Sequence, residues 1–185
     1  YGGEHGEAMV RLLAQHGGHV ATNMQDVGGQ TALMFAARRG GAHAEAMVRV
    51  LMQHGGHVAV NTQRARGRTA LMLAVKYGGK HAEATMRVLI KAGADVDKQD
   101  DEGMTALMIA AEHGGEHGAG MMRLLVDAGA DANKQDEDGW TALMYAARYG
   151  GEHAVAMVRV LVTCGATLPP GKELPSKTPP ELALY

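Results

Sequence analysis

The string Thr-Ala-Leu-Met occurs four times in this chain, beginning at Thr31, Thr69, Thr105 and Thr141. Successive copies therefore lie 38, 36 and 36 residues apart. A period of this length is typical of a repeat protein, in which small units stack because none of them can bury its apolar faces alone. We therefore expect the 185 residues to form an elongated array of units rather than one ordinary domain.

Each copy of the string begins a segment with the pattern of two helices. Small residues follow it, then a glycine pair such as Gly114-Gly115, and then apolar residues spaced three and four apart, which mark one face of a second helix. A closing glycine such as Gly129 ends the unit. We expect the Thr hydroxyl to cap the first helix and the glycine after each helix to be left-handed. Polar turns such as residues 98–103 should join the units as tight hairpins.

The complete pattern is Gly-x-Thr-Ala-Leu-Met-x-Ala-Ala-x-x-Gly, then Val-Arg-x-Leu, then Gly-Ala-Asp-x-x-x-Gln-Asp. It resembles the ankyrin repeat, whose signature has Thr-Pro-Leu-His in place of Thr-Ala-Leu-Met. The resemblance covers nearly the whole chain and implies an all-α fold, a solenoid of stacked helix-turn-helix units with short hairpin-like fingers. The units would be a half repeat at 1–30, repeats at 31–68, 69–104, 105–140 and 141–177, and a truncated half repeat at 178–185.

Several features depart from the family pattern. The units have 36 residues rather than 33, with the extra three beside the Gly-Gly-x-His segment, so the second helix is expected to begin one turn early. The hairpins after Gly17 and Gly55 carry two additional residues, and we expect these two fingers to differ in shape from the others. Packing must replace the hydrogen bond that the family's His makes across repeats, because that His is replaced by Met34, Met72, Met108 and Met144. The proline-rich stretch 168–180 is interpreted as a looser C-terminal cap.

The resemblance implies a concave binding face formed by the fingertips and the first helix of each unit. Large and varied side chains occupy these positions while the framework around them repeats, which favours a recognition surface. The main alternative is a structural spacer of a longer repeat protein with no dedicated partner, and Trp140 alone could instead fold back on its own hairpin. The candidate residues for binding a protein or peptide are Gln30, Arg38, Arg39, Arg66, Arg68, Lys76, Tyr77, Met104, Glu112, His113, Trp140, Arg148 and Tyr149.

Charge is unevenly spread, although the net charge is only −2. Residues 31–80 contain eight basic residues and one acidic residue, a net charge of +7, whereas residues 93–140 contain three basic and twelve acidic residues, a net charge of −9. We therefore expect a partner of complementary charge whose association slows with added salt. Arg64, Arg66 and Arg68 form one basic finger without aromatic neighbours, which suits an acidic peptide and makes nucleic acid a weak alternative.

Catalytic and cofactor chemistry is disfavoured by the same pattern. The periodic histidines His5, His43, His81, His117 and His153 are one helical layer apart, too far to share a zinc ion, so we expect them to cap or pin the second helices. The glycine pairs lack the strand and the Lys of a phosphate loop. Neither a nucleophile elbow nor a carboxylate pair stands out, so the chain is predicted to be a non-enzyme without metal or cofactor.

The single Cys164 is expected to be a packed thiol, and one cysteine allows no internal disulfide. This cysteine usage favours a reducing compartment, cytoplasmic or nuclear, for the protein. No apolar run approaches the roughly 18 residues that span a bilayer, so no membrane contact is predicted. We expect the chain to be a monomer.

Overall fold

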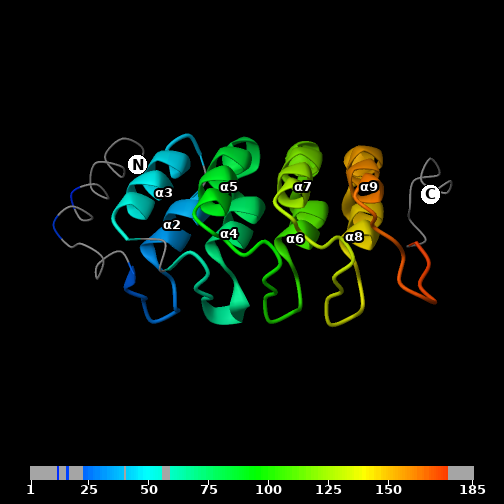
Figure 1. The fold of residues 1–185 in the computed structure, drawn as a ribbon, viewed down its shortest axis with the longest axis horizontal. Coiled ribbons are helices and arrows are strands. Elements are labelled where there is room, and N and C mark those ends of the chain that lie inside the picture. Colours follow the sequence, from blue (N-terminus) through cyan, green and yellow to red (C-terminus); the bar gives the residue numbers. More distant parts are fainter. Residues whose placement is uncertain (1–11, 13–15, 17–22, 40, 56–58, 175–185) are drawn as a thin grey trace. The chain divides into compact units, whose positions relative to one another are not determined.

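The computed structural model describes residues 12, 16, 23–39, 41–55 and 59–174. The chain divides into two compact units, residues 1–95 and 96–185. Both are built from pairs of helices without a strand among the described residues, and a finger-like loop leads into each first helix (Figure 1). This architecture confirms the all-α fold of helix-turn-helix repeats.

The first unit contains two helix pairs, and the second unit contains two more. In the first unit the elements are α2 (Ala32–Arg39), α3 (Ala44–Gln53), the 3-10 turn η2 (Ala65–Gly67), α4 (Ala70–Tyr77), η3 (Gly79–His81) and α5 (Ala82–Lys91). In the second unit they are α6 (Ala106–His113), η4 (Gly115–His117), α7 (Gly118–Asp127), α8 (Ala142–Tyr149), η5 (Gly151–His153) and α9 (Ala154–Thr163).

Within each unit, equivalent helices pack on one another. Helix α2 packs on α4 and α3 on α5, while α6 packs on α8 and α7 on α9. Each unit therefore has a layer of first helices, on the side of the fingers, and a layer of second helices (Figure 1). The core lies where the layers meet and consists of aliphatic, Ala and Met side chains. Its largest fully buried members are Leu33, Met34, Leu71, Met72, Leu73, Met86, Leu89, Leu107, Met108, Met121, Met122 and Leu125.

The repeated Thr caps the first helix in three of the four copies. The hydroxyls of Thr31, Thr69 and Thr105 each accept a hydrogen bond of 3.3 Å from the backbone N–H three residues later. The prediction fails at Thr141, whose hydroxyl is buried and makes no capping bond. A capping hydroxyl satisfies one of the backbone donors that the first turn of a helix leaves without a partner.

The Met that replaces the family's His is a core residue with a second role. Met34, Met72, Met108 and Met144 are at most 3% exposed. The sulfur atoms of Met72 and Met108 also accept the backbone N–H of the capping Thr at 3.5 Å. Packing therefore replaces the missing imidazole, as predicted, and a weak sulfur hydrogen bond supplements it.

The glycine pairs between the helices use their two residues differently. The closing glycines Gly55, Gly93, Gly129 and Gly165 have φ angles of 89–101°, which confirms the left-handed C′ prediction at the second helices. After the first helix the prediction is wrong for the first glycine of the pair, because Gly78 is right-handed with φ −73°. A Cβ atom at Gly78 would lie 2.5 Å from the Ala74 oxygen and 2.6 Å from the Cα of Ala82, so close approach requires this glycine. Its neighbour Gly79 adopts the left-handed conformation instead, with φ +52°.

The three extra residues of the long repeat form a 3-10 turn directly before the second helix. Turns η3, η4 and η5 each lead straight into the following helix, so these helices begin about one turn early, as expected. The periodic His residues His43, His81, His117 and His153 occupy the N-cap position, but their side chains make no capping hydrogen bond. The capping role predicted for them is therefore wrong: their backbone is already helical, whereas a residue that caps through its side chain usually has an extended backbone. His5 lies outside the described residues.

The fingers end in five-residue turns of one length. The N–H at the first position bonds to the carbonyl oxygen at the fifth, at 3.0–3.1 Å, in Asp26–Gln30, Arg64–Arg68, Asp100–Met104 and Asp136–Trp140. The additional residues of the second finger lie before the turn, where Ala59 and Val60 are buried. The second finger does differ in shape, but at its tip, where η2 contains Arg66 at φ +70°. The preceding part of the first finger lies outside the described residues.

Side-chain amides fasten the bases of the second and the fourth finger to the next repeat. Asn61 donates to the Gly93 oxygen at 2.9 Å and accepts the Asp95 N–H at 2.7 Å. Asn133 repeats the arrangement one unit later, with the Gly165 oxygen at 3.1 Å and the Thr167 N–H at 2.8 Å. These bonds satisfy backbone groups that lie outside helices, where no regular ladder is present to satisfy them.

The difference between the capping threonines can be tested by replacing each hydroxyl with a methyl group. We expect Thr105→Val to lower the free energy of unfolding by about 1 kcal/mol, because it removes a helix cap. The matched change Thr141→Val should cost less than about 0.5 kcal/mol, because the buried hydroxyl it removes makes no capping bond. Urea unfolding followed by circular dichroism measures both values, and equal costs would contradict the assignment of the caps.

The two roles within a glycine pair predict different costs for the same substitution. Gly78→Ala should cost about 3 kcal/mol or more, because its new methyl group would overlap backbone atoms that cannot move apart. Gly79→Ala should cost about 1 kcal/mol, since the left-handed backbone strains an L side chain but leaves it in open space. The denaturation midpoints of the two variants give the comparison, and a greater loss at Gly79 would reverse the assignment.

Candidate functional site

All five aromatic residues in the described part of the chain lie outside the core. Phe35, Tyr77, Tyr145 and Tyr149 are on first helices, and Trp140 is at a fingertip. Phe35 is 44% exposed, Tyr77 43% and Tyr149 50%. Large aromatic side chains gain the most from burial, so their collection on one layer of the fold marks a surface available for contact.

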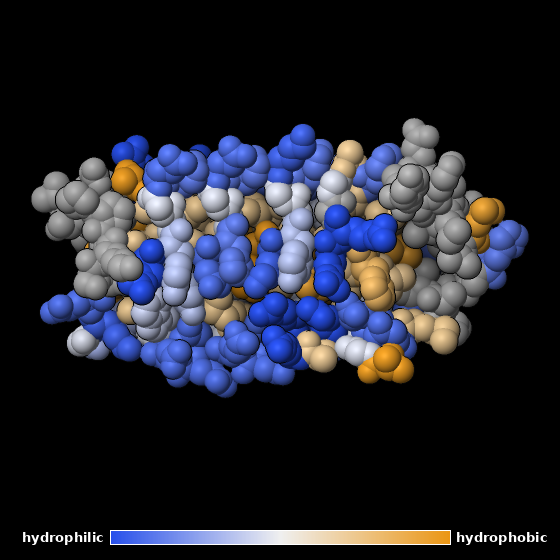
Figure 2. Space-filling view, turned by 180° about the vertical axis from the view of Figure 1, so that it is seen from behind, coloured by the Kyte–Doolittle hydropathy of each residue, from blue (hydrophilic) through white to orange (hydrophobic). Residues whose placement is uncertain are grey.

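The space-filling view in Figure 2 shows one face of the molecule, on which hydrophilic residues predominate and the more hydrophobic residues are scattered among them.

In the second unit three rings follow one another from the fingertip along α8. The ring centroids of Trp140 and Tyr145 are 5.3 Å apart with the planes tilted by 57°, and those of Tyr145 and Tyr149 are 6.0 Å apart and nearly stacked. We call these three residues the aromatic row. The guanidinium of Arg148 lies 5.8 Å from the centre of the Tyr149 ring. Contacts of this kind hold the rings in fixed positions at little further entropic cost on binding.

Asp136 fastens the last fingertip to helix α8. One carboxylate oxygen accepts the backbone N–H groups of Asp138 at 3.0 Å and Trp140 at 2.8 Å, while the other accepts the Tyr145 hydroxyl at 2.6 Å. Burial, together with this bond to a carboxylate, raises the pKa of Tyr145 well above its usual value. The phenol therefore remains a donor throughout the physiological range, and Trp140 is presented by a turn that is held at both ends.

The sequence left two interpretations of Trp140 open, a residue that contacts a partner or a side chain that folds back on its own hairpin. Trp140 is half-buried and contacts Tyr145 of the helix that follows its own finger, so it does fold back in part. It is not sealed in the core, and its remaining surface continues the exposed part of the row. A half-buried Trp with a fixed orientation is the usual form of an interface anchor.

In the first unit the exposed aromatics lie beside arginines. The guanidinium of Arg38, on α2, lies 5.6 Å from the centre of the Tyr77 ring, on α4. Arg38 and Arg39 are both exposed at the end of α2, and Phe35 is exposed one turn before them. Arginine over an aromatic ring is a cation–π pair that keeps most of its donors available for a partner.

Of the thirteen predicted binding residues, the structure leaves all but Met104 at least partly exposed. Those that are exposed are Arg38, Arg39, Arg66, Tyr77, His113 and Tyr149. Those that are half-buried are Gln30, Arg68, Lys76, Glu112, Trp140 and Arg148. These residues stay divided between the two units, Gln30 to Tyr77 in the first and Glu112 to Tyr149 in the second.

The prediction that Met104 belongs to an exposed binding surface is wrong, because its side chain is only 6% exposed. Its backbone closes the fingertip turn with Asp100, as Trp140 does with Asp136. An apolar, unbranched side chain has no polar end to hold it in water, so it turns inward from a position where Arg and Trp stay partly in solvent. Met104 therefore belongs to the core rather than to the binding surface.

Sequence reasoning missed Phe35, Tyr145 and Asp136. The first two occupy one position of the first helix, which holds Leu73 and Ile109 in the other repeats. Leu73 and Ile109 are buried, whereas Phe35 and Tyr145 are not. The change from aliphatic to aromatic at this position was the available signal, since the space that accepts Leu is too small for a ring.

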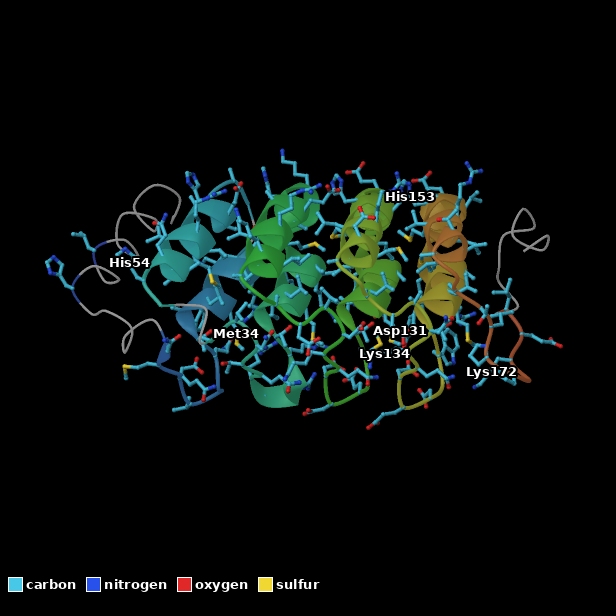
Figure 3. All side chains as sticks on the ribbon, viewed as in Figure 1. Met34, His54, Asp131, Lys134, His153 and Lys172 are labelled. Atoms are coloured by element: carbon cyan, nitrogen blue, oxygen red, sulfur yellow. The ribbon has the colours of Figure 1, made fainter. Side chains whose placement is uncertain are left out.

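Cys164 and the histidines of the described ranges do not gather into a reactive site. Cys164 is exposed, so the predicted packed thiol is wrong: the residue follows the last turn of α9, where no helix covers it. Partial burial of the sulfur raises the thiol pKa, which lowers its reactivity. Among the described residues no three potential ligands gather around one point. His153 lies at the end of its helix pair far from Lys134 and the fingers (Figure 3).

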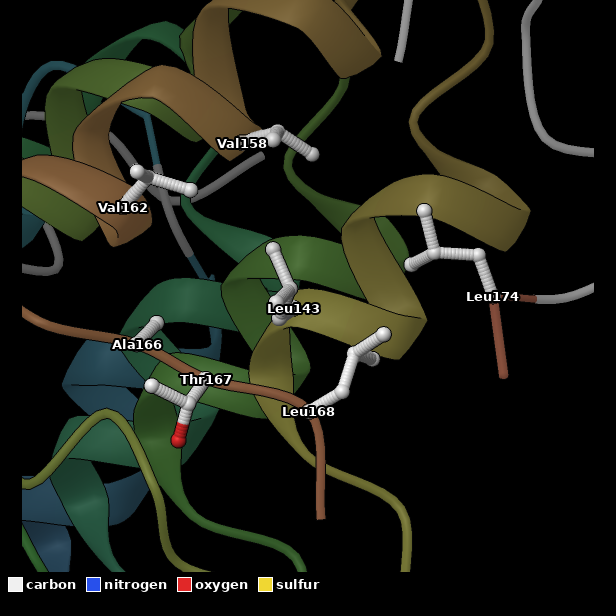
Figure 4. Close-up of a pocket in the computed structure, with 7 residues that line it drawn as sticks. All are labelled: Leu143, Val158, Val162, Ala166, Thr167, Leu168 and Leu174. Atoms are coloured by element: carbon white, nitrogen blue, oxygen red, sulfur yellow. The ribbon is translucent and has the colours of Figure 1, made fainter. Parts of the chain in front are cut away.

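An apolar groove of about 230 Å³ lies at the end of the last helix pair. Leu143, Val158 and Val162 from α8 and α9 face Leu168 and Leu174 of the following segment (Figure 4). Lys172, from the same segment, donates to the Asp138 oxygen of the last finger at 3.1 Å. These contacts agree with a cap over the last repeat, while residues 175–180 of the predicted cap lie outside the described part.

Membrane insertion finds no support in the helices. None of the helices in the described ranges combines the length and apolarity that a bilayer crossing requires.

Comparison with known proteins identifies this architecture. A family model of ankyrin repeats in three copies matches residues 2–100 and again residues 80–169. The chain belongs to the ankyrin repeat family. Ankyrin repeats are in general a protein–protein interaction module, and the family is not enzymatic. No curated protein sequence matches the chain.

Solved ankyrin repeat domains are similar to this chain over most of its length. An ankyrin repeat domain from Acinetobacter baumannii is 28% identical with a TM-score of 0.72, and the match covers 84% of this chain and 74% of that one. The ankyrin repeat domain of Bcl-3, described as a unique member of the IkappaB protein family, is 30% identical with a TM-score of 0.71. That match covers 87% of this chain and 66% of the Bcl-3 domain, so this chain spans about two thirds of it.

The bond between Tyr145 and Asp136 predicts a pH-dependent loss of stability. Below the ordinary tyrosine pKa of about 10, the phenol is protonated in the folded and the unfolded chain. At higher pH the unfolded chain loses this proton and the folded chain keeps it, so the free energy of unfolding falls as the pH rises. Tyr145→Phe should cost about 1 kcal/mol at neutral pH and show a smaller fall above pH of about 10.

The control for this measurement is Tyr149→Phe, on the same helix. Urea unfolding of the two variants and the wild type at several pH values gives the comparison. If Tyr145→Phe followed the wild-type pH profile, the hydroxyl–carboxylate bond would not be present in solution.

Proposed function

We propose that the chain binds a protein or peptide partner on the surface formed by its first helices and fingertips. The observation that carries this proposal is the placement of every described aromatic residue on that surface and none in the core. The residues involved in the second unit are those of the aromatic row and Arg148. In the first unit they are Phe35, Tyr77, Arg38 and Arg39.

The composition of this surface fits what binding requires. Trp, Tyr and Arg supply most of the free energy at protein interfaces, because they offer large contact area and several donors for few rotatable bonds. The rings of the aromatic row are held by one another and by the Asp136 turn. A partner would therefore meet a surface that loses little conformational entropy on binding.

The core of the fold is filled without aromatic residues in the described part of the chain. It consists of Leu, Met, Val and Ala side chains, many of them less than 2% exposed. Retaining seven aromatic residues in a chain of 185, with five of them placed outside the core, is explained by contact with another molecule. A spacer without a partner would have no use for the exposed rings of Phe35, Tyr77 and Tyr149.

The proposal is tested by capture from a lysate of the source cells with the immobilised chain. We expect the double variant Trp140→Ala, Tyr149→Ala to lose at least about tenfold in recovery of the specific partner, because hot-spot truncation costs 2 kcal/mol or more in binding. The matched control Arg123→Ala, Arg159→Ala changes two exposed residues of the second helices in the same unit and should recover the partner like the wild type.

Equal recovery of every protein by all three forms would favour the spacer alternative. Circular dichroism establishes that the variants are folded before the comparison is made. Loss by the control variant alone would place the binding surface on the second helices and contradict the proposed location.

A further inference from the structure

The cationic residues of the first unit are distributed unequally between its two helical layers. On the second helices, Arg49 pairs with Glu45 and Arg87 with Glu83, each one turn away. The first helices α2 and α4 contain no acidic residue, and neither does the finger segment 59–68. The second helices α3 and α5 thus have two acidic residues against Arg49, Arg87 and Lys91, a net charge of +1, whereas the charged residues of the first helices and the second finger are all basic.

Six basic residues lie on the first helices and the second finger, and we call them, together with the exposed rings of Phe35 and Tyr77, the cationic face. Three of the six end the first helices and three belong to the second finger: Arg38, Arg39, Lys76, Arg64, Arg66 and Arg68. Both groups belong to the side of the fold that carries the fingers (Figure 1). Asp26, in the first finger, is the single acidic residue among the fingers and first helices of residues 23–77.

The helix dipole explains part of this pattern and leaves the rest. Cations in the last turn of a helix interact favourably with its free carbonyl groups, which accounts for Arg38, Arg39 and Lys76. It does not account for three arginines in a finger. Of these, Arg66 is exposed and has a left-handed backbone, with φ +70°. This conformation is unfavourable for residues other than Gly, Asn and Asp. A strained Arg at a fingertip indicates that the side chain itself is required.

We propose that the cationic face binds an acidic segment of the partner, rich in Asp and Glu and containing apolar side chains. This inference rests on the proposed function and specifies the chemistry of the partner at the first unit. The exposed guanidinium groups of Arg38, Arg39 and Arg66 each offer a planar pair of donors that matches a carboxylate, and the exposed rings of Phe35 and Tyr77 offer apolar contact between the charges. The mixture of charge and ring surface fits a peptide with both kinds of side chain.

The dimensions of the unit suit an extended peptide. A first helix of eight residues is about 12 Å long, and the finger continues beyond its start. An extended segment of about eight residues reaches roughly 27 Å, enough to pass from the fingertip to the end of the helix. A segment of this length would meet both cationic groups and the rings.

A nucleic acid is the less favoured polyanion. Residues 93–140 of the same chain carry a net charge of −9, which would repel a long chain of phosphates but not a short peptide held by one unit. The finger itself, residues 59–68, contains no aromatic residue, and the two rings of the cationic face lie on separate first helices, so there is no run of rings on which successive bases could stack. RNA is therefore included in the experiment as a competing outcome.

The test begins with selection of a phage-displayed library of random twelve-residue peptides on the intact chain. We expect the enriched peptides to contain more Asp and Glu than Lys and Arg. The most enriched peptide, labelled with fluorescein, is then measured by anisotropy, and its affinity should fall at least about tenfold between roughly 50 and 300 mM salt.

Matched variants locate the binding. Arg38→Glu, Arg39→Glu should weaken binding of the labelled peptide by at least about tenfold, whereas Arg49→Glu, Arg87→Glu, with the same change in net charge on the other layer, should change it by less than about twofold. Arg66→Gly keeps the left-handed turn and removes one cation. It should weaken binding about two- to fivefold without lowering the midpoint of urea unfolding, so a loss of binding cannot be ascribed to misfolding.

Several results would overturn the inference. They are enrichment of basic or neutral peptides, no enrichment at all, equal weakening by the two double charge variants, or tighter binding of a twelve-nucleotide RNA than of the peptide. If the enriched peptides are basic and lose binding to Trp140→Ala, Tyr149→Ala, the proposed function stands and the acidic partner is excluded. The proposed function is tested separately by the capture from lysate. It is contradicted if the wild type and Trp140→Ala, Tyr149→Ala capture the same proteins.

Discussion

The fold depends on how closely the two helices of a repeat approach each other. At Gly78 and at Gly150 the position of a missing Cβ lies within 2.7 Å of the backbone of the second helix, so only hydrogen fits there. This contact allows first helices of eight residues to be covered by helices of ten. Helices so short are unstable alone, and their stability comes from the layer that covers them. The small residues around this contact therefore determine the distance between the two helical layers.

This spacing also explains the separation of stability from recognition. A narrow gap between layers accepts Ala, Leu and Met but leaves little room for a ring, so the aromatic side chains stay at its edge. The same edge receives the ends of the first helices and the fingertips. Residues such as Tyr77 and Trp140 are thereby fixed by the fold without being part of its core, and they can differ between repeats while the framework does not.

Much of the fold could be predicted from the repeat, because the pattern of small and apolar residues is a direct record of which sides of the helices are buried. The period, the helices, the left-handed closing glycines and three of the four Thr caps follow from local rules that act within a few residues. The predicted binding positions are largely solvent-accessible for the same reason, since they occupy equivalent places in each unit. Whether they bind is a property that the repeat alone does not determine.

The errors arise where a local pattern has two physical solutions. Met104 and Trp140 share a position in the turn, and only the tertiary surroundings decide that one side chain turns inward. A glycine directly after a helix suggests a left-handed residue, yet Gly78 is needed for contact and its neighbour Gly79 for the turn. Asp136 looked like one more acidic turn residue, and its bond to Tyr145 crosses nine residues and belongs to one repeat alone. Contacts of this kind have no periodic signature.

The amide bridges of Asn61 and Asn133 have a consequence for how such a chain can change over time. Each bridge holds the root of a finger through backbone atoms of the next repeat, so its geometry is indifferent to the side chains at the tip. The tips are thus free to be exchanged one after another without dismantling the layers beneath them. A chain built in this way can acquire a new ligand through a few substitutions at its fingertips, while the helices that stabilise the fold stay unchanged.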